Sequence, residues 1–231
     1  MNIIVNGGSG GIGREVALLF AADRDNQIIV TGRNEQRLRK LQLECPHGNL
    51  SVIQADISNM SGEIEVLKHQ IYNRFSKVDI LINMAGYLAK GDFLELPEED
   101  SRRMMETNFF GPAALIKLAA PLMPSGSHIV NISSMGGFQG SSKYRGLSVY
   151  SASKAALSCL SECLAGEFSE PGISVNCLAL GSVQTEMFEN AFPGFNAQMS
   201  TEEMAGFIVW FASKGHKFFN GKVLPVAVTN P

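Results

Sequence analysis

The fold is decided by the stretch Asn2-Ile3-Ile4-Val5-Asn6-Gly7-Gly8-Ser9-Gly10-Gly11-Ile12-Gly13. Its first part, Asn2–Asn6, predicts a strand, the glycines predict a tight turn, and Arg14–Ala22 predicts a helix. A flexible glycine loop is the simpler interpretation. The position between the first strand and the first helix instead favours a dinucleotide site, because glycines let the backbone approach a pyrophosphate and a helix N-terminus offers free N–H groups.

Strands and helices alternate along the rest of the chain. The other expected strands are Gln27–Thr31, Leu50–Ala55, Val78–Asn83, Ser127–Ile132, Ile173–Ala179 and Lys222–Val226. The other expected helices are Asn34–Cys45, Ser61–Phe75, Leu96–Leu122 with a bend at Gly111-Pro112, Ala155–Phe168 and Thr201–Ser213. This pattern predicts an α/β fold: a single-domain, Rossmann-type, doubly wound parallel sheet of about seven strands with helices on both faces.

The composition fits one domain over residues 1–231. Of the 231 residues, 45% are hydrophobic and 18% charged, and the net charge is −3. We therefore expect no nucleic-acid partner. No apolar run is long enough to span a membrane, and no basic segment precedes the apolar N-terminus, so we expect neither a membrane partner nor a signal peptide. The predicted location is the cytoplasm.

The cysteines and histidines predict no metal site. Cys45, Cys159, Cys163 and Cys177 fit neither a disulfide framework nor zinc-ligand spacing, and the four histidines are scattered. Cys159 and Cys163 lie one helical turn apart, and we interpret them as a buried, reduced pair.

Tyr150 and Lys154 form the first candidate for chemistry. Four residues apart at the start of an expected helix, they share one face, with Cβ atoms about 5–6 Å apart. A neighbouring ammonium favours the phenolate and lowers the pKa of a tyrosine, which is ordinarily near ~10. An acid or base works best near ambient pH. By itself, the pair is also compatible with an ordinary half-exposed helix face.

The end of the second expected strand indicates the cofactor. It reads Thr31-Gly32-Arg33-Asn34, and no carboxylate occurs before Glu35 to hold the ribose 2′-hydroxyl of NAD. Arg33 offers planar, bidentate donors for the 2′-phosphate of NADP. A solvated arginine at a helix start is the alternative. We expect NADP(H) to be favoured over NAD(H).

Three further residues lie at expected strand ends, where ligands bind in such sheets. They are Asp56, Asn83 and Gly86. Each is equally compatible with a turn or cap residue.

Taken together, these stretches resemble the classical short-chain dehydrogenase/reductase family over essentially the whole chain. Asn6–Gly13 resembles its Thr-Gly-x-x-x-Gly-x-Gly loop, with Asn6 replacing threonine. Asp56-Ile57 resembles its adenine-contacting pair, and Asn83-Met84-Ala85-Gly86 resembles its Asn-Asn-Ala-Gly. The family's four catalytic positions match Asn108, Ser134, Tyr150 and Lys154.

The resemblance implies hydride transfer between nicotinamide and a carbonyl or secondary alcohol. Tyr150 would be the general acid/base, Lys154 would lower its pKa and bond the nicotinamide ribose, Ser134 would polarise the carbonyl, and Asn108 would support a water. The implied cofactor-binding residues are Gly7, Ser9, Gly10, Gly11, Ile12, Gly13, Arg33, Asp56, Ile57, Asn83, Ala85, Gly86, Tyr150, Lys154, Gly181, Val183 and Thr185. A homodimer or homotetramer is also implied.

Several features depart from the family pattern. Leu180-Gly181 replaces the usual Pro-Gly, and Gly10 stands where many NADP-preferring relatives carry a second basic residue. The loop before Tyr150 is longer than usual, which leaves Ser133 as an alternative to Ser134. The tail, residues 226–231, lacks the common closing glycine pair, which bears on dimer versus tetramer.

The substrate is indicated only by residues 186–200, expected to be a loop or short helix that covers it. Their Met and Phe residues suit a partly apolar carbonyl or alcohol, and equally suit ordinary core packing. Two rival functions remain. An epimerase or dehydratase on the same fold tends to have a separate C-terminal substrate region. A catalytically silent sensor or scaffold usually loses the tyrosine or lysine.

Overall fold

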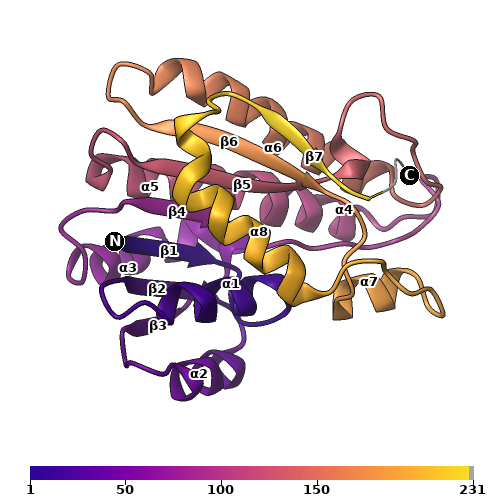
Figure 1. The fold of residues 1–231 in the computed structure, drawn as a ribbon. Helices are drawn as coiled ribbons and strands as arrows, with labels where there is room; N and C mark the ends of the chain where they lie inside the picture. The colour runs from indigo at the N-terminus through magenta and orange to yellow at the C-terminus, as the bar shows by residue number, and fades with distance from the viewer. Residues whose placement is uncertain (229–231) are drawn as a thin grey trace.

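The structure of the protein is a computed structural model that describes residues 1–228. Within this range, seven parallel strands form one sheet in the order β3-β2-β1-β4-β5-β6-β7 (Figure 1). The strands are β1 Asn2–Asn6, β2 Gln27–Gly32, β3 Leu50–Gln54, β4 Ile80–Asn83, β5 His128–Ser134, β6 Ser174–Leu180 and β7 Val223–Val226. The order reverses between β1 and β4, and such a switch point opens a crevice beyond the carboxyl ends of the strands. The predicted Rossmann-type sheet is confirmed.

Helices cover both faces of this sheet (Figure 1). They are α1 Gly11–Ala21, α2 Glu35–Glu44, α3 Met60–Tyr72, α4 Glu98–Met105, α5 Gly111–Ala119, α6 Ser148–Glu167, α7 Glu186–Ala191 and α8 Thr201–Lys214. Short helical turns lie at Ile57–Asn59, Ala120–Leu122, Met135–Gly137 and Gly215–Lys217. Side chains of β1 alternate between two cores: Ile3 and Val5 pack with α1, α2 and α8, whereas Ile4 packs with α3, α5 and α6.

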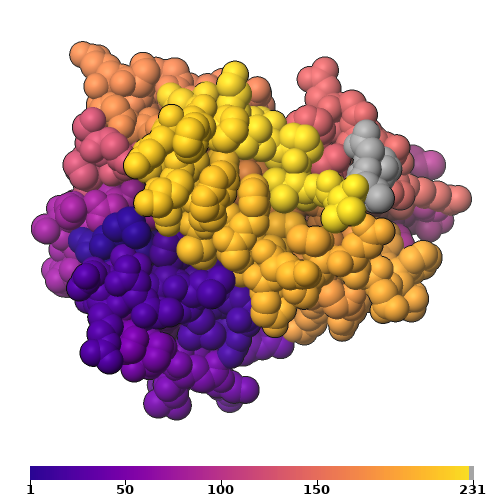
Figure 2. Space-filling view, viewed as in Figure 1, coloured from indigo at the N-terminus to yellow at the C-terminus, as the bar shows by residue number. Residues whose placement is uncertain are grey.

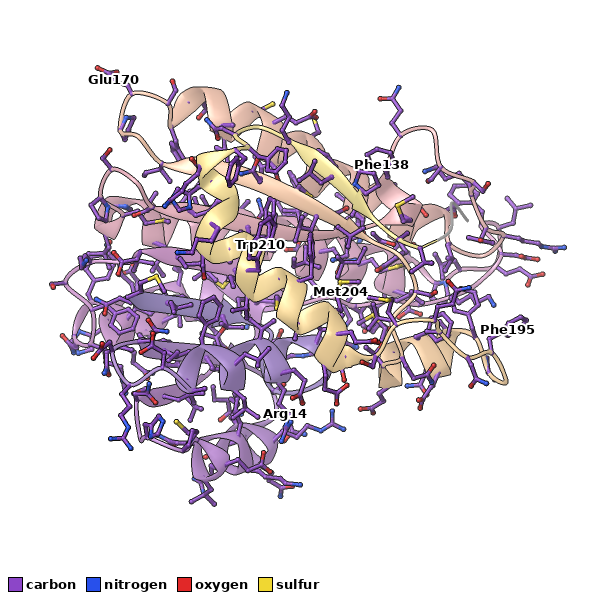
Figure 3. All side chains as sticks on the ribbon, viewed as in Figure 1. Arg14, Phe138, Glu170, Phe195, Met204 and Trp210 are labelled. Carbon is purple, nitrogen blue, oxygen red and sulfur yellow. The ribbon has the colours of Figure 1, made fainter. Side chains whose placement is uncertain are left out.

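Helix α8 joins the two halves of the molecule on one face. It packs against α1, and Figure 2 shows the gold C-terminal part of the chain adjoining the indigo N-terminal part. Met204 of α8 is buried, whereas Trp210 on the same helix is half exposed (Figure 3). No helix in the part of the chain that the structure describes is long and apolar enough to cross a bilayer. The tail without the closing glycine pair spans residues 226–231, and its last three residues, 229–231, lie outside the described residues.

The long helix expected over Leu96–Leu122 is interrupted from Glu106, five residues before the predicted bend at Gly111-Pro112. A π-helical turn, Glu106–Phe110, joins α4 to α5 immediately before Gly111-Pro112. Proline has no N–H for the carbonyl four residues earlier, so Pro112 leaves the Asn108 carbonyl without its α-helical partner. A Cβ on Gly111 would lie 2.4 Å from Ile57 Cγ1, so only glycine fits there. Such turns often occur at functional sites.

The prediction that Cys159 and Cys163 are buried is wrong. Both are exposed and free, on the outer face of α6. The inner face of this helix, which carries Leu157, Ser161 and Ala165, packs toward the sheet. One helical turn separates the two cysteines, so when one faces solvent the other does too. The helix also begins earlier than expected, at Ser148 instead of Ala155, and so includes the whole Tyr150–Lys154 segment.

Candidate active site

The glycine turn after β1 is pressed against the sheet and the first helix. Gly7 has a left-handed φ of 87°, and a Cβ there would lie 2.3 Å from the Ala85 backbone nitrogen. A Cβ on Gly13 would lie 2.4 Å from the Gly7 carbonyl oxygen. Any larger residue at either position would push the turn away. The turn therefore forms a backbone cradle at the N-terminus of α1, which fits a pyrophosphate.

A positively charged cavity lies beside this cradle. Its volume is about 540 Å³, and its lining residues are Ser9, Arg33, Asn34, Arg37 and Arg103. Asn34 caps α2 by accepting a hydrogen bond from the Arg37 backbone nitrogen. The structure thus brings the predicted Arg33 together with two arginines that sequence reasoning missed. Arg37 lies in the first turn of α2, only four residues after Arg33, and this closeness in sequence could have indicated it.

A chain of buried amide and hydroxyl groups crosses the carboxyl end of the sheet. Thr31 Oγ1 donates to Asn6 Oδ1 at 2.9 Å, and Asn6 Nδ2 donates to Asn83 Oδ1 at 3.4 Å. Asn83 Nδ2 donates to Asn131 Oδ1 at 2.8 Å, and Asn131 Nδ2 donates to Ser161 Oγ at 2.8 Å. We call these five residues the amide ladder. Both ends of the Asn83 side-chain amide are used within it, so that side chain ties strand ends together.

Asp56 acts as a cap in this structure. Its Oδ1 accepts hydrogen bonds from the backbone nitrogen and hydroxyl of Ser58, at 3.0 and 2.7 Å. Ile57 is buried against Gly111. The two residues fix the chain where it leaves the sheet beside the nucleotide crevice.

Tyr150 and Ser134 bring their hydroxyl groups together. Burial raises the pKa of Tyr150 above its ordinary value, and the neighbouring Ser134 hydroxyl opposes that rise. The Ser133 hydroxyl forms other hydrogen bonds: it donates to the Lys154 carbonyl at 2.8 Å and accepts from the Ser158 hydroxyl. Of the two candidate serines, only Ser134 therefore has its hydroxyl at the tyrosine.

Lys154 is buried, and its Nζ donates to the Ile132 carbonyl at 2.9 Å. Burial lowers the pKa of Lys154 to about 8. The expectation that this ammonium lowers the pKa of Tyr150 is wrong for this structure, because burial raises that pKa and the group that opposes the rise is Ser134, not Lys154. The two side chains nevertheless share one face of α6, as predicted.

Asn108 lies in the π-helical turn and is fully buried. Its Oδ1 accepts from the Tyr87 nitrogen at 2.8 Å, and its Nδ2 donates to the Tyr87 carbonyl at 2.9 Å and to Ser153 at 2.9 Å. A Cβ on Gly86 would lie 3.6 Å from both Asn108 Oδ1 and Lys154 Nζ. The fold thus gathers two of the four predicted catalytic side chains around Gly86.

The segment after β6 closes over this crevice. Thr185 caps α7 by accepting a bond from the Phe188 nitrogen at 3.1 Å, and its Cγ2 would lie 3.7 Å from a Cβ on Gly11. Val183 forms a bridge with Met199, which pins both ends of the segment. Leu180, in place of the usual proline, ends β6 opposite Val226, and Gly181 contacts Ala227.

The apolar side chains of residues 186–200 lie in different environments. The Met187 methyl would lie 3.7 Å from a Cβ on Gly86, so Met187 lies on the same side as Asn108 and Lys154, which also surround Gly86. Phe195 is 69% exposed on the loop that follows α7 (Figure 3). Lys90 donates to the Ala191 carbonyl at 3.0 Å and lies over the Phe192 ring. These contacts place α7 above the predicted site and leave the following loop in solvent.

The glycine cradle at the switch point of the parallel sheet defines a class: a single Rossmann-type domain. Comparison with known proteins agrees. The family model for short chain dehydrogenases matches residues 1–195. Dehydrogenase/reductase SDR family member 7B of Danio rerio is 35% identical over 202 residues, covering 83% of this chain and 64% of that protein. The chain belongs to the short-chain dehydrogenase/reductase family, whose members are NAD(P)-dependent oxidoreductases.

Solved structures agree with this assignment. A short-chain dehydrogenase/reductase mutant of Serratia marcescens is 26% identical, with a TM-score of 0.87 over 97% of this chain and 95% of its own. A short chain dehydrogenase of Shigella flexneri, complexed with NADP, is 25% identical, with a TM-score of 0.87 and the same coverage. The chain spans less than two thirds of the length of its vertebrate relatives, from 59% to 64%.

Proposed function

We propose that this protein is an NADP(H)-dependent oxidoreductase that transfers a hydride between nicotinamide and a carbonyl or secondary alcohol. The observation that carries the proposal is that Tyr150 and Ser134 are neighbours at the carboxyl edge of the sheet, with the buried Lys154 one turn along α6 from the tyrosine. When bound, the cofactor supplies or accepts the hydride. The residues of the chain supply geometry, charge and the proton.

Tyr150 is the general acid in the direction of reduction. Its raised pKa keeps the hydroxyl protonated at neutral pH, so it can donate to the developing alkoxide. Ser134 holds the carbonyl oxygen and stabilises its charge. Lys154 contributes an ammonium and bonds the nicotinamide ribose. Asn108, whose carbonyl lacks an α-helical partner, supports a water that reconnects the lysine to solvent.

The preference for NADP(H) over NAD(H) is supported by charge. Gly32 puts no carboxylate where the ribose 2′-hydroxyl would be held, and Arg33 lines the adjoining cavity. A 2′-phosphate in that cavity would form charge-assisted hydrogen bonds. The Shigella flexneri relative complexed with NADP offers independent support for this choice.

The substrate is proposed to be a small, partly apolar carbonyl compound or alcohol beneath residues 186–200. Met187 facing Gly86 supports an apolar surface there. We further propose a cytoplasmic homodimer or homotetramer. The sensor or scaffold alternative is disfavoured by the retention of both Tyr150 and Lys154, with Ser134 beside the tyrosine.

The direct test is a screen of ketones, aldehydes, quinones and acyl thioesters, following the loss of NADPH or NADH absorbance. The proposal expects oxidation of NADPH by at least one carbonyl class, with lower kcat/KM for NADH. Tight NADPH binding without turnover of any compound would instead support the sensor alternative. Equal kcat/KM for both cofactors would remove the NADP preference and leave the reaction class in place.

A further inference from the structure

Arg37 occupies the space above Gly10 in the glycine turn. Its Nη1 would lie 3.4 Å from a Cβ on Gly10. The guanidinium therefore lies where a basic side chain at position 10 would extend. It lines the same cavity as Arg33, which lies just before the N-cap of α2. The Arg37 guanidinium, which comes from α2, thus lies beside a glycine turn that has no charged side chain of its own.

The three arginines of this cavity are not equivalent. Arg103 lies over the ring of Tyr87, 4.4 Å from the ring centroid, and is held there by a cation–π contact. Arg37 is instead paired with Glu186, the first residue of α7, at 2.9 Å between Nη2 and Oε2. No carboxylate lines the cavity within residues 1–228, so its charge favours an anion.

The Arg37–Glu186 pair is weak enough to be exchanged. The side chains are 52% and 67% exposed, and pairs of this kind contribute little because solvent screens them. A phosphate brings a larger charge and several acceptor oxygens, which suit bidentate donation from a guanidinium. A phosphate in the cavity would therefore compete successfully with the Glu186 carboxylate.

We propose that Arg37 is the second cation of the 2′-phosphate site and that Glu186 is the counter-ion which the phosphate displaces. The inference rests on the proposed use of NADP and adds a residue that determines this specificity.

The test uses calorimetric binding of two cofactor fragments, 2′,5′-ADP and 5′-AMP, which differ only in the 2′-phosphate. Arg37→Gln should weaken 2′,5′-ADP about tenfold and leave 5′-AMP within about twofold. The matched control is Arg39→Gln, on the same helix, where Arg39 pairs with Glu35 and does not line the cavity. This control should bind both fragments as the wild type does.

Glu186→Gln should strengthen 2′,5′-ADP binding by about two- to fivefold, because the competing carboxylate is gone. In an Arg37→Gln background the same change should have no effect, since the two residues act through one contact. An equal gain in both backgrounds would overturn the counter-ion role, because Glu186 would then act only through its long-range charge.

An Arg37→Gln variant that binds 2′,5′-ADP as tightly as the Arg39→Gln control would overturn the inference. The parallel variant Arg33→Gln distinguishes this outcome from failure of the proposed function. If Arg33→Gln weakens 2′,5′-ADP and Arg37→Gln does not, only the role of Arg37 fails. If the wild type binds both fragments equally, the NADP preference fails and the inference fails with it.

Discussion

The Nζ of Lys154 donates a hydrogen bond to the backbone carbonyl of Ile132 at 2.9 Å, and this bond connects helix α6 to strand β5. The lysine is only 4% exposed, and burial lowers its pKa to about 8. Its ammonium is therefore positioned by the sheet before any ligand arrives. This contact fixes the lysine in the role we propose for it.

Lys154→Met should lower both turnover and affinity for NADPH, because it removes the charge near the proton donor and a ribose contact. The loss of affinity should be about tenfold, typical for a hydrogen bond to a charged group. Fluorescence titration with NADPH measures it separately from kcat. An unchanged NADPH affinity would remove the ribose contact from the mechanism.

Alanine substitutions at Ser133 and Ser134 should differ in their effect on activity. Ser134→Ala should lower kcat more than Ser133→Ala does, since that hydroxyl neighbours Tyr150, and should also cost some stability because the Gly136 nitrogen loses its acceptor. Ser133→Ala should keep more activity and lose about 1 kcal/mol of stability, since its buried hydroxyl bonds the Lys154 carbonyl. Kinetics and urea unfolding of both variants make the comparison. The reverse order of activity would assign the carbonyl-polarising role to Ser133.

The amide ladder should contribute substantially to stability. Asn131→Ala leaves Asn83 Nδ2 without its acceptor and takes away the bond that Ser161 Oγ accepts, and an unsatisfied buried group costs about 1–3 kcal/mol. We expect the free energy of unfolding to fall by at least about 2 kcal/mol in urea. Asn73→Ala, at an exposed asparagine on the surface, is the control. A change no larger than that of the control would show that the ladder is energetically neutral.

His128 should make stability fall in acid. The Ala212 carbonyl lies 3.0 Å from its Nδ1, and Asn176 Nδ2 lies 3.0 Å from its Nε2. Nδ1 is then the donor and Nε2 the acceptor, so a second proton would face another donor. Burial lowers the pKa of His128 from 6.5 to about 4. Between these pH values the unfolded chain binds more protons, so stability is full above pH 6.5 and declines toward pH 4.

The size of this decline should be on the order of 3 kcal/mol from His128 alone. Urea unfolding at a series of pH values from 7 to 4 measures it. His128→Gln should flatten the pH dependence relative to the wild type, whereas His47→Gln, at an exposed histidine, should not. Parallel pH profiles for wild type and His128→Gln would contradict the prediction.

Local patterns predicted much of this fold, and long-range contacts account for what they missed. Strand β1 begins and ends at the predicted residues because its apolar run is bounded by polar ones. The amide ladder depends on register: Asn6 pairs with Asn83, and Asn83 with Asn131, only once the strand order is known. The raised pKa of Tyr150 likewise depends on burial by distant segments, which a four-residue spacing does not reveal.

The central claim is that Tyr150 donates the proton in an NADP(H)-dependent reduction. Tyr150→Phe removes that hydroxyl and little else, so one preparation of the variant should be tested for both NADPH binding and turnover of the best carbonyl compound from the screen. We predict NADPH affinity within about twofold of the wild type and a fall in kcat of about 10²–10⁴-fold, the usual contribution of a general acid. A variant that binds NADPH normally and retains more than about a tenth of the wild-type kcat would contradict the claim.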